Sequence, residues 1–419
     1  MSSVPALIGR HLEAIVARHL AIDPVVILNG ARTVGKSTLL RASAQSHSVK
    51  VLDLDELTTR EVVARDPSLH VRGREPICID EFQHVLPLLD AIKAELNHDL
   101  RPGRYLLTGS TRYATLPATS QSLTGRAHII NVWPLSQGEL RGHRETFLDQ
   151  LMDDPRAMVT PIVSETSREE YERMVLTGGF PLALARPLEK QRHDWFRGFV
   201  QMVVTRDVLE IRRVRQRQLL PRVLQRLAAQ SAQMLNMSAV ASAVQEPVRT
   251  IEDYVGLLEA VFLVHRLEAY GRTLGSRVRG APKIHLIDSG LAAHVMGITE
   301  GKLAARDPST QTEFGHLVES FAVNEIIKQS GWSATYAAFS HFRTPDVEVD
   351  LVCEADDGRI AGVEVKATSR IDDRELNGLR SLRDKLGRDF VGGVVLYLGD
   401  RAYTREDRIH VLPMDRVWM

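Results

Sequence analysis

The chain has little of what marks secreted or membrane-spanning proteins. It contains two cysteines in 419 residues, Cys78 and Cys353, and both lie in apolar runs. We therefore expect buried thiols in a reducing, cytoplasmic compartment, with no disulfide and no cysteine-ligated metal. No apolar run approaches the ~20 residues of a membrane-spanning helix, so no membrane partner is expected. The early charges of Arg10, Glu13 and Arg18 argue against a secretory signal.

The chain also lacks an excess of charge of either sign. Its 53 Lys and Arg residues balance 53 Asp and Glu residues, so any surface that binds nucleic acid must be a local patch. Aromatic residues make up 5% of the chain, but the hydrophobic share of 44% and the charged share of 25% are typical of globular domains. The length is typical of ~3 domains.

The most informative motif is G-x-x-x-x-G-K-S at residues 30–37. It follows an apolar run at 25–28 that suits a buried strand, and it precedes a helical pattern, which is the context of a phosphate-binding loop. In such a loop, backbone N–H groups wrap the phosphates of ATP. Lys36 would reach the β- and γ-phosphate oxygens, and the Ser37 hydroxyl would bind Mg²⁺. The predicted ATP-binding residues here are Gly30, Ala31, Arg32, Thr33, Val34, Gly35, Lys36, Ser37 and Thr38.

Two further strand ends supply candidate residues for nucleotide chemistry. The apolar strand at 77–79 is followed by Asp80, which could hold Mg²⁺ through water, and by Glu81, which could polarise the attacking water. The strand at 104–107 is followed by Thr108 and Ser110, whose hydroxyls could sense the γ-phosphate or orient the water. An ordinary polar turn explains these two hydroxyls equally well.

Alternating strand and helix patterns predict an α/β P-loop domain over residues 1–140. Its strands are expected near 25–29, 50–54, 76–80, 104–108 and 128–132. The alternation favours a parallel sheet with helices on both faces. The chain then turns helical and arginine-rich, and we interpret 141–218 as a helical lid or connector. A polar run at 307–312 is interpreted as a linker to a final α/β domain over 307–419.

Residues 219–300 have the pattern of a winged helix. A helix is expected over 219–234, a second from Ser238, and a third capped by Thr250. Strands are expected over 262–270 and 283–287, with Arg272, Arg277 and Arg279 in the turn between them.

Such a module could place a helix in the major groove and its wing on phosphates, so DNA is the predicted partner. Arg212, Arg213, Arg215 and Arg217 could add phosphate contacts, or could form a solvated helix face. Glu252 and Asp253 are badly suited to face phosphates, and a protein-interaction or structural role is the alternative.

The last domain offers a second catalytic candidate. A hairpin of strands at 347–352 and 362–366 would bring Asp350 close to Glu364 and Lys366, and the preceding helix offers Glu319. Three such carboxylates could hold Mg²⁺ or Mn²⁺, and the lysine could orient or deprotonate water. This is the D…ExK arrangement of PD-(D/E)xK nucleases, although Val349 rather than proline precedes Asp350. A nuclease-like fold that cuts nothing is the alternative.

As a set, these motifs resemble bacterial and archaeal ATPases that pair an AAA-type domain (AAA_14) with a DUF4143 region. The resemblance rests on residues 30–37, 80–83, 107–110, 123–126, 134–136 with Glu139, 178–181, 206–207, 282–283, 288–291 and 364–366. It implies an ATP-binding domain, a helical and winged-helix middle, and a restriction-nuclease-like α/β C-terminal domain. In this resemblance Arg126 falls at the place of an arginine finger, and Arg112 is a second candidate. A finger acting in trans requires a homo-oligomer; a surface salt bridge is the alternative role for either arginine.

Three functions are compatible with the sequence. The first is a Mg²⁺-dependent ATPase that drives or gates a DNA-directed activity, with metal-dependent cleavage at the C-terminal site. The second is a nucleotide-switched regulatory or binding module whose nuclease-like domain is inert. The third is a nuclease for which ATP is only a structural or allosteric ligand. Glu81 favours hydrolysis over binding alone, and Asp350, Glu364 and Lys366 keep cleavage among the candidates.

Overall fold

The computed structural model describes residues 7–47, 49–112, 123–208, 216, 218–271 and 280–419. The chain divides into two compact units: residues 1–135, 201–217 and 256–263 form the first, and residues 136–200, 218–255 and 264–419 form the second. The division into four segments at 1–140, 141–218, 219–300 and 307–419 thus stays a prediction. No helix in the described part of the chain combines the length and apolar character of a membrane span.

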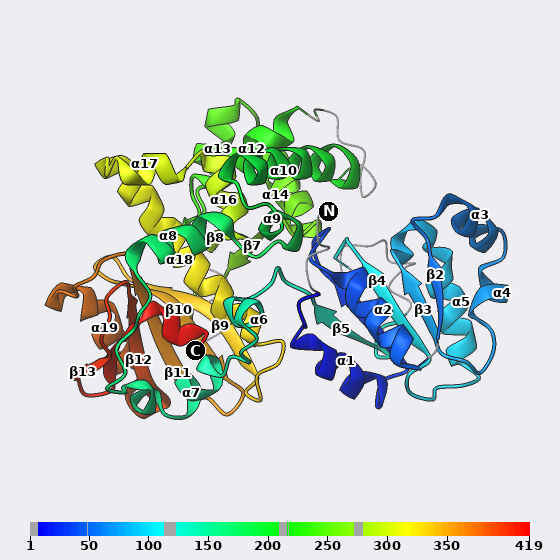
Figure 1. The fold of residues 1–419 in the computed structure, drawn as a ribbon, viewed down its shortest axis with the longest axis horizontal. Helices are drawn as coiled ribbons and strands as arrows, with labels where there is room; N and C mark the ends of the chain where they lie inside the picture. The colour runs from blue at the N-terminus through cyan, green and yellow to red at the C-terminus, as the bar shows by residue number, and fades with distance from the viewer. Residues whose placement is uncertain (1–6, 48, 113–122, 209–215, 217, 272–279) are drawn as a thin grey trace. The chain divides into compact units, whose positions relative to one another are not determined.

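The first unit is built on a five-stranded parallel sheet, as the alternation of patterns predicts (Figure 1). Its order is β2-β3-β4-β1-β5. The strands are β1 (Val25–Asn29), β2 (Lys50–Asp53), β3 (Ile77–Asp80), β4 (Tyr105–Gly109) and β5 (Ala127–Asn131). The helices are α1 (Leu12–Leu20), α2 (Lys36–His47), α3 (Leu57–Arg65), α4 (Pro67–Val71) and α5 (Pro87–Leu96), with a 3₁₀ turn at Phe82–Val85.

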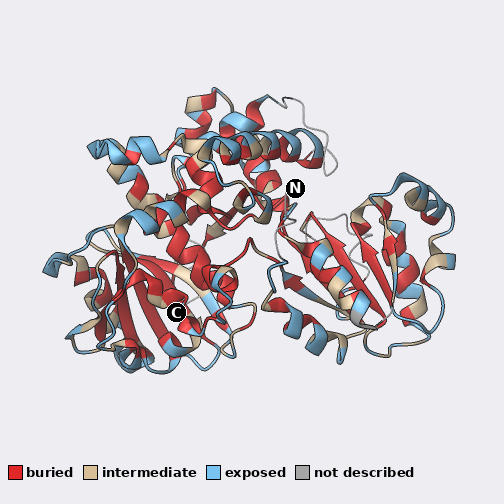
Figure 2. Ribbon diagram, viewed as in Figure 1, coloured by how far each residue is buried: buried red, intermediate tan, exposed pale blue. Residues whose placement is uncertain are grey.

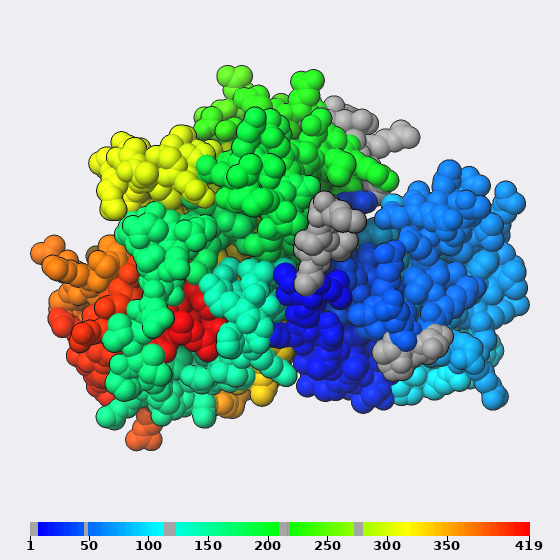
Figure 3. All heavy atoms as spheres, in the orientation of Figure 1, coloured from blue at the N-terminus to red at the C-terminus, as the bar shows by residue number. Residues whose placement is uncertain are grey.

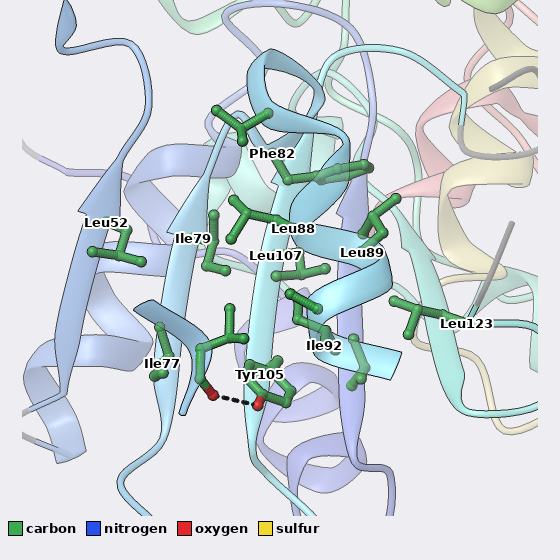
Figure 4. Packing of buried hydrophobic residues seen from close by; sticks show 14 of the residues in the cluster. Leu52, Ile77, Ile79, Phe82, Leu88, Leu89, Ile92, Tyr105, Leu107 and Leu123 are labelled. Carbon is green, nitrogen blue, oxygen red and sulfur yellow. Dashed lines mark hydrogen bonds between the residues drawn. The ribbon is translucent and has the colours of Figure 1, made fainter. Parts of the chain in front are cut away.

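Helices cover both faces of this sheet, and burial of the strands follows from that. All five residues of β1 are buried, which is the pattern of a strand with both faces covered. On one face, Ile79, Leu107 and other strand residues pack against Leu88 and Ile92 of α5 (Figure 4). Figure 2 shows the resulting buried strands between exposed outer helix surfaces. The polar residues at the carboxyl edge of the sheet therefore lie next to a buried core.

The second unit begins with a series of helices. They are α6 (Gln137–Arg141), α7 (Phe147–Asp153), α8 (Arg168–Thr177) and α9 (Pro181–Leu184). The next helix, α10 (Glu189–Met202), belongs to the second unit up to residue 200. The segment that precedes α8 packs on the C-terminal part of the chain: Thr166 donates to Asp415 at 2.9 Å and Arg416 donates to the carbonyl of Ile162 at 2.5 Å. Figure 3 shows the C-terminal residues, coloured red, beside this teal and green segment.

Three helices and a small antiparallel sheet follow in the order helix–strand–helix–helix–strand–strand. They are α12 (Leu219–Ala228), β6 (Gln233–Met234), α13 (Met237–Val244), α14 (Val248–Ala260), β7 (Val264–Leu267) and β8 (Lys283–Leu286). The sheet order is β6-β8-β7.

Three sequence-based boundaries in this region were wrong. The first helix ends at Ala228 rather than at 234, because β6 occupies 233–234. Asn236 caps the second helix, whose start lies before Ser238. The third helix begins at Val248, so Thr250 lies within its first turn and does not cap it.

Helices α16 (Ser289–Met296), α17 (Glu300–Ala304) and α18 (Pro308–Gln329) lead into the last part of the chain. The polar run at 307–312 is not a linker: Asp307 caps α18, and Pro308 is its first residue. Asp307 and Pro308 are a favourable cap and first helical residue, so this polar stretch starts a helix.

The C-terminal sheet is mixed and has the order β13-β14-β12-β11-β10-β9. Its strands are β9 (Ala337–Arg343), β10 (Glu348–Ala355), β11 (Ile360–Lys366), β12 (Phe390–Tyr397), β13 (Tyr403–Glu406) and β14 (Ile409–Pro413). Strands β10 and β11 form the predicted antiparallel hairpin, and α19 (Asn377–Leu386) packs its leucines into the core of this sheet.

Candidate functional sites

The phosphate-binding loop joins the carboxyl end of β1 to the first residue of α2. Thr33 and Gly35 have φ angles of 63° and 101°, in the left-handed region that a tight loop requires. A Cβ on Gly30 would lie 2.2 Å from the carbonyl oxygen of Val132. Arg10, which sequence reasoning missed as a loop contact, donates to the carbonyl of Val34 at 2.6 Å. The loop is therefore shaped by its own backbone and held from outside.

Lys36 is buried in this loop and bonds to neutral groups. Its Nζ donates to the carbonyl oxygens of Gly30 and Ala31 at 2.9 and 2.8 Å, and the residue is 3% exposed. Burial lowers the pKa of Lys36, and the charge of Glu81 opposes that shift. The ammonium group thus has no anion in direct hydrogen-bonded contact among the described residues, which fits a phosphate-binding role.

Asp80 and Ser37 meet beside the loop, as a Mg²⁺ site requires. Ser37 Oγ donates to Asp80 Oδ1 at 3.0 Å, and Thr108 also donates to that oxygen. Burial raises the pKa of Asp80, while the hydrogen bonds from Thr108 and Ser37 act against the rise. Hydroxyl and carboxylate oxygens are ligands that Mg²⁺ prefers, so these residues fit the ion.

Glu81 is held in a strained backbone conformation at the end of β3. Its φ is 54°, its backbone N–H donates to Thr108 Oγ1 at 2.9 Å, and the residue is 6% exposed. Gln83 Nε2 donates to the Glu81 carboxylate and to Ser110 Oγ. Burial alone would raise the pKa of Glu81, but the charge of Lys36 and the hydrogen bond from Gln83 bring it below its usual value. Glu81 is therefore an ionised, oriented carboxylate.

Arg32 of the loop forms an ion pair that sequence reasoning missed. Its Nε lies 2.7 Å from Asp207 Oδ2, and the side-chain exposures are 20% and 6%. Asp207 lies in the π-helical turn Val203–Asp207, which belongs to the first unit although it is distant in sequence. The residue was part of the family resemblance at 206–207, but no sequence spacing linked it to the loop.

The two predicted finger arginines lie at different places. Arg126 donates to the carbonyl of Lys93 at 3.2 Å and to Asn97 Oδ1 at 2.8 Å, at the C-terminal end of α5. Arg112 donates its backbone N–H to Ala260, and its guanidinium lies 5.1 Å from the centroid of the Phe262 ring. Neither contact involves the phosphate-binding loop, so a role as a finger stays a prediction.

The C-terminal candidates line one pocket of the second unit. Glu319, Asp350, Glu364 and Lys366 surround a volume of ≈ 520 Å³, together with Glu348 and His316. Lys366 Nζ lies 2.5 Å from Glu364 Oε1, and Asp350 Oδ2 accepts the backbone N–H of Val365 at 2.9 Å. The four sequence-predicted residues are thus brought together.

Lys283 of β8 lies among these carboxylates, and sequence reasoning gave it no role in the site. Its Nζ is 2.6 Å from Glu319 Oε1, 2.5 Å from Glu348 Oε1 and 2.9 Å from Asp350 Oδ1. Burial alone would lower the pKa of Lys283, but Asp350 and Glu319 raise it. The lysine is therefore charged, and it occupies the space between Glu319 and Asp350 that a bridging metal would need.

Glu364 differs from these paired groups. Its Oε2 is buried and has no hydrogen-bond partner among the described residues. Burial, with the charge of Asp350, raises the pKa of Glu364 to about 8. In this arrangement the residues Glu319 and Asp350 do not fit a metal ion between them, whereas Glu364 retains an unsatisfied oxygen.

His19, Asp23 and His128 form another cluster of potential ligands in the first unit, with candidate ligand atoms within 4.8 Å of one another. His19 Nδ1 and Asp23 Oδ2 are already hydrogen-bonded at 2.8 Å. The rings of His19 and His128 are stacked, with centroids 3.5 Å apart and planes 12° from parallel. Because a ring nitrogen binds a metal in its own plane, this stack is poorly arranged for a shared ion.

The seven arginines predicted to contact DNA all lie outside the described residues. These are Arg212, Arg213, Arg215, Arg217, Arg272, Arg277 and Arg279. Within the described part of the module, Arg222 and Arg226 are exposed on α12, while Glu252 and Asp253 are exposed on α14.

The parallel sheet, the loop and the carboxylates at its edge define a P-loop nucleotide-binding domain. Residues 23–141 match the model of an AAA domain (AAA_14), which supports ATP binding and hydrolysis with Mg²⁺. Residues 168–302 match a domain of unknown function (DUF8612), and residues 314–417 match a second one (DUF4143). The two ends of the chain thus match the AAA_14 and DUF4143 models, the two domain families that the resemblance named.

Several known proteins are similar to this chain. An uncharacterised protein of Mycobacterium tuberculosis is 24% identical over 411 residues, which cover 97% of this chain and 84% of that protein. One from Haemophilus influenzae is 24% identical over 299 residues, which cover 66% of this chain and 70% of that protein.

Among solved structures, the Walker-type ATPase of Pyrococcus abyssi aligns with a TM-score of 0.44 and 16% identity, covering 69% of this chain and 96% of that one. The RuvB Holliday junction branch migration motor of Thermotoga maritima aligns with a TM-score of 0.30 and 18% identity, covering 62% and 90%.

Proposed function

We propose that this protein is a Mg²⁺-dependent ATPase whose hydrolysis drives or gates an activity on DNA. The observation that carries hydrolysis is Glu81, a buried carboxylate kept ionised beside Lys36 and oriented by Gln83. An ionised carboxylate at this strand end can polarise the water that attacks the γ-phosphate, while Ser37 and Asp80 hold the metal ion.

The support for DNA as the partner is the helix and strand order of residues 219–286. The order helix–strand–helix–helix–strand–strand, with the sheet order β6-β8-β7, is the basis on which we assign a winged-helix module. Of its described charged residues, Arg222 and Arg226 are one turn apart on the exposed side of α12 and can reach two phosphates together. On α14 the exposed Glu252 and Asp253 outnumber the exposed Arg249 and carry the wrong charge for that contact, so we assign the phosphate contacts to α12.

A steady-state ATPase assay with and without duplex or single-stranded DNA tests the proposal. We expect DNA to change the rate, and Arg222→Ala with Arg226→Ala to weaken binding and reduce its salt slope by ~2. Glu252→Ala with Asp253→Ala is the matched control on α14 and is expected not to weaken binding. An ATPase rate that neither form of DNA alters would reject the DNA-directed part and leave the ATPase.

One observation favours the second candidate, a nucleotide-switched regulator with an inert nuclease-like domain. The D…ExK residues are present on β10 and β11, but Lys283 fills the space between Glu319 and Asp350. We propose that cleavage is absent in this arrangement. Incubation of duplex DNA with the protein, ATP and Mn²⁺ tests this point; cleavage that is lost in Lys366→Ala would contradict it.

We also propose assembly as a condition for full ATPase activity, with Arg126 or Arg112 as the finger of a neighbouring subunit. In the first unit Arg126 contacts the end of α5 rather than the loop, which is compatible with action on another copy. Hydrolysis per subunit should then rise with protein concentration and fall in Arg126→Ala or Arg112→Ala without loss of ATP binding. A rate per subunit that is constant with concentration, from a monomer in sedimentation, would remove the trans finger.

A further inference from the structure

Lys283 is a buried lysine that reaches a carboxylate cluster from a different sheet. It is 0% exposed and lies on β8 of the three-stranded sheet, whereas its partners Glu348 and Asp350 lie on β10 of the six-stranded sheet. Its third partner, Glu319, is on α18. A lysine in this position costs stability unless its charge is compensated. The three ion pairs compensate it.

The surroundings of β8 fix the position of the ammonium group. His285, two residues further and on the same side of the strand, accepts or donates a hydrogen bond with Ser320 Oγ at 2.9 Å. Ser231 also meets Ser320 Oγ at 2.9 Å. The His285 contact joins β8 directly to α18, and this fixes the strand from which Lys283 extends. The three ion pairs hold its Nζ in place.

The ammonium group and a metal ion would compete for the same oxygens. Mg²⁺ binds oxygen at about 2.0–2.1 Å, and Lys283 Nζ already lies 2.6 Å from Glu319 Oε1 and 2.9 Å from Asp350 Oδ1. An ion that used both oxygens would overlap the ammonium group. Glu364, by contrast, pairs with Lys366 through Oε1 only, and its Oε2 has no hydrogen-bond partner among the described residues.

We propose that Lys283 is the resident cation of this cluster and excludes a divalent ion from Glu319 and Asp350 while β8 is packed on α18. The inference deepens the proposed function, because it rests on the assignment of an inert nuclease-like domain and gives that inertness a cause. It also predicts how the site is opened: movement of β8 away from α18 withdraws the ammonium group and leaves three carboxylates for a metal ion.

Titration of the full chain with Mn²⁺ in the absence of nucleotide, followed by calorimetry, tests the proposal. Without phosphate groups, the loop at Lys36 lacks most ligands of its ion, so the C-terminal cluster dominates the signal. We expect Lys283→Met to bind Mn²⁺ at least ~10-fold more tightly than the wild type. Adding Glu319→Gln to Lys283→Met should remove that gain.

Lys328→Met is the matched control, since Lys328 of α18 is, like Lys283, a buried lysine with a carboxylate partner, Glu325 at 2.5 Å. It should leave Mn²⁺ affinity unchanged. A folded Lys283→Met that gains no Mn²⁺ affinity would overturn the proposal. If Lys283→Met does not fold, Glu319→Gln alone decides: unchanged Mn²⁺ affinity relative to the wild type supports exclusion, and weakened affinity overturns it. Cleavage of DNA by the wild type would reject the inert domain without altering this titration, so the two proposals can fail separately.

Discussion

The two candidate sites each contain a buried lysine, and they differ in what that lysine contacts. Lys36 donates to the backbone carbonyls of Gly30 and Ala31, and burial lowers its pKa. Lys283 contacts three carboxylates, whose charges raise its pKa despite burial. An ammonium group on carbonyl dipoles still gains by meeting a phosphate, whereas one that is paired with three carboxylates has little to gain from any ligand.

The buried glutamates of the two sites differ in the same sense. Nearby Lys36 and the hydrogen bond from Gln83 lower the pKa of Glu81 despite its burial. Burial and the charge of Asp350 raise the pKa of Glu364 to about 8. The charged groups of the N-terminal site are thus arranged to interact with a bound anion. Those of the C-terminal site are compensated by one another.

The largest effect should come from Glu81→Gln. The amide keeps the size of the side chain but cannot act as a base, so we expect kcat to fall by about 10²–10⁴-fold with ATP binding retained. Steady-state hydrolysis with a fluorescent nucleotide titration measures both. Glu61→Gln, at an exposed position of α3, is the control. Hydrolysis at the wild-type rate in Glu81→Gln would show that Glu81 is not the base, and the contrast with Glu364 would then be lost.

Lys36→Ala should have the next largest effect, on affinity. Removing a buried charge that pairs with phosphate costs about 2–5 kcal/mol, so ATP should bind at least ~30-fold more weakly. Equilibrium titration with ATP and Mg²⁺ measures the change. Lys93→Ala on the exposed side of α5 is the matched control. Retained affinity in Lys36→Ala would show that this lysine, like Lys283, interacts with groups of the protein and does not bind the phosphates.

Glu364→Gln should change how stability depends on pH. The folded pKa of about 8 lies above the ordinary 4.5, so the folded chain binds more protons than the unfolded chain between these values. The contribution of Glu364 to stability is therefore present below pH 4.5 and is lost as pH rises through 8.

Because glutamine cannot ionise, the melting temperature of Glu364→Gln relative to the wild type should increase from pH 5 to pH 8.5, by about a few degrees. Thermal unfolding without metal measures the difference. Glu313→Gln, at an exposed position of α18, controls for the loss of a carboxylate. A difference that stays constant over this range would contradict a protonated Glu364.

The smallest effect concerns the ion pair that ties the loop to a distant segment. If Asp207 positions Arg32, then Arg32→Ala and Asp207→Asn should each weaken ATP binding. Their effects should be non-additive by about 1 kcal/mol, because the side chains are in direct contact. A double-mutant cycle on ATP affinity measures the coupling; additive effects would separate Asp207 from the nucleotide site.

For the N-terminal site, the sequence indicated which residues lie at the carboxyl edge of the sheet, because their positions follow from local order along the chain. Their roles, and those of Arg126 and Arg112, stay predictions. Each predicted residue lies at or soon after a strand end. Lys36 and Ser37 follow the loop after β1, Asp80 ends β3 and Glu81 follows it, and Thr108 is the next-to-last residue of β4. Parallel strands bring their carboxyl ends to one edge, so knowing the strands is enough to know that these residues meet. The orientation of Glu81 by Gln83 and the pairing of Arg32 with Asp207 were not predictable, since side-chain contacts have no period in the sequence.

For the C-terminal site, the sequence determined which carboxylates share a hairpin, because alternation and a turn at 356–358 imply an antiparallel pair with Asp350 close to Glu364. Only the tertiary structure decided what fills the space between Glu319 and Asp350. Lys283 precedes Glu319 by 36 residues and Asp350 by 67, and it reaches them because β8 packs on α18. Long-range packing, driven by the burial of both surfaces, placed a charge where no local pattern indicates one.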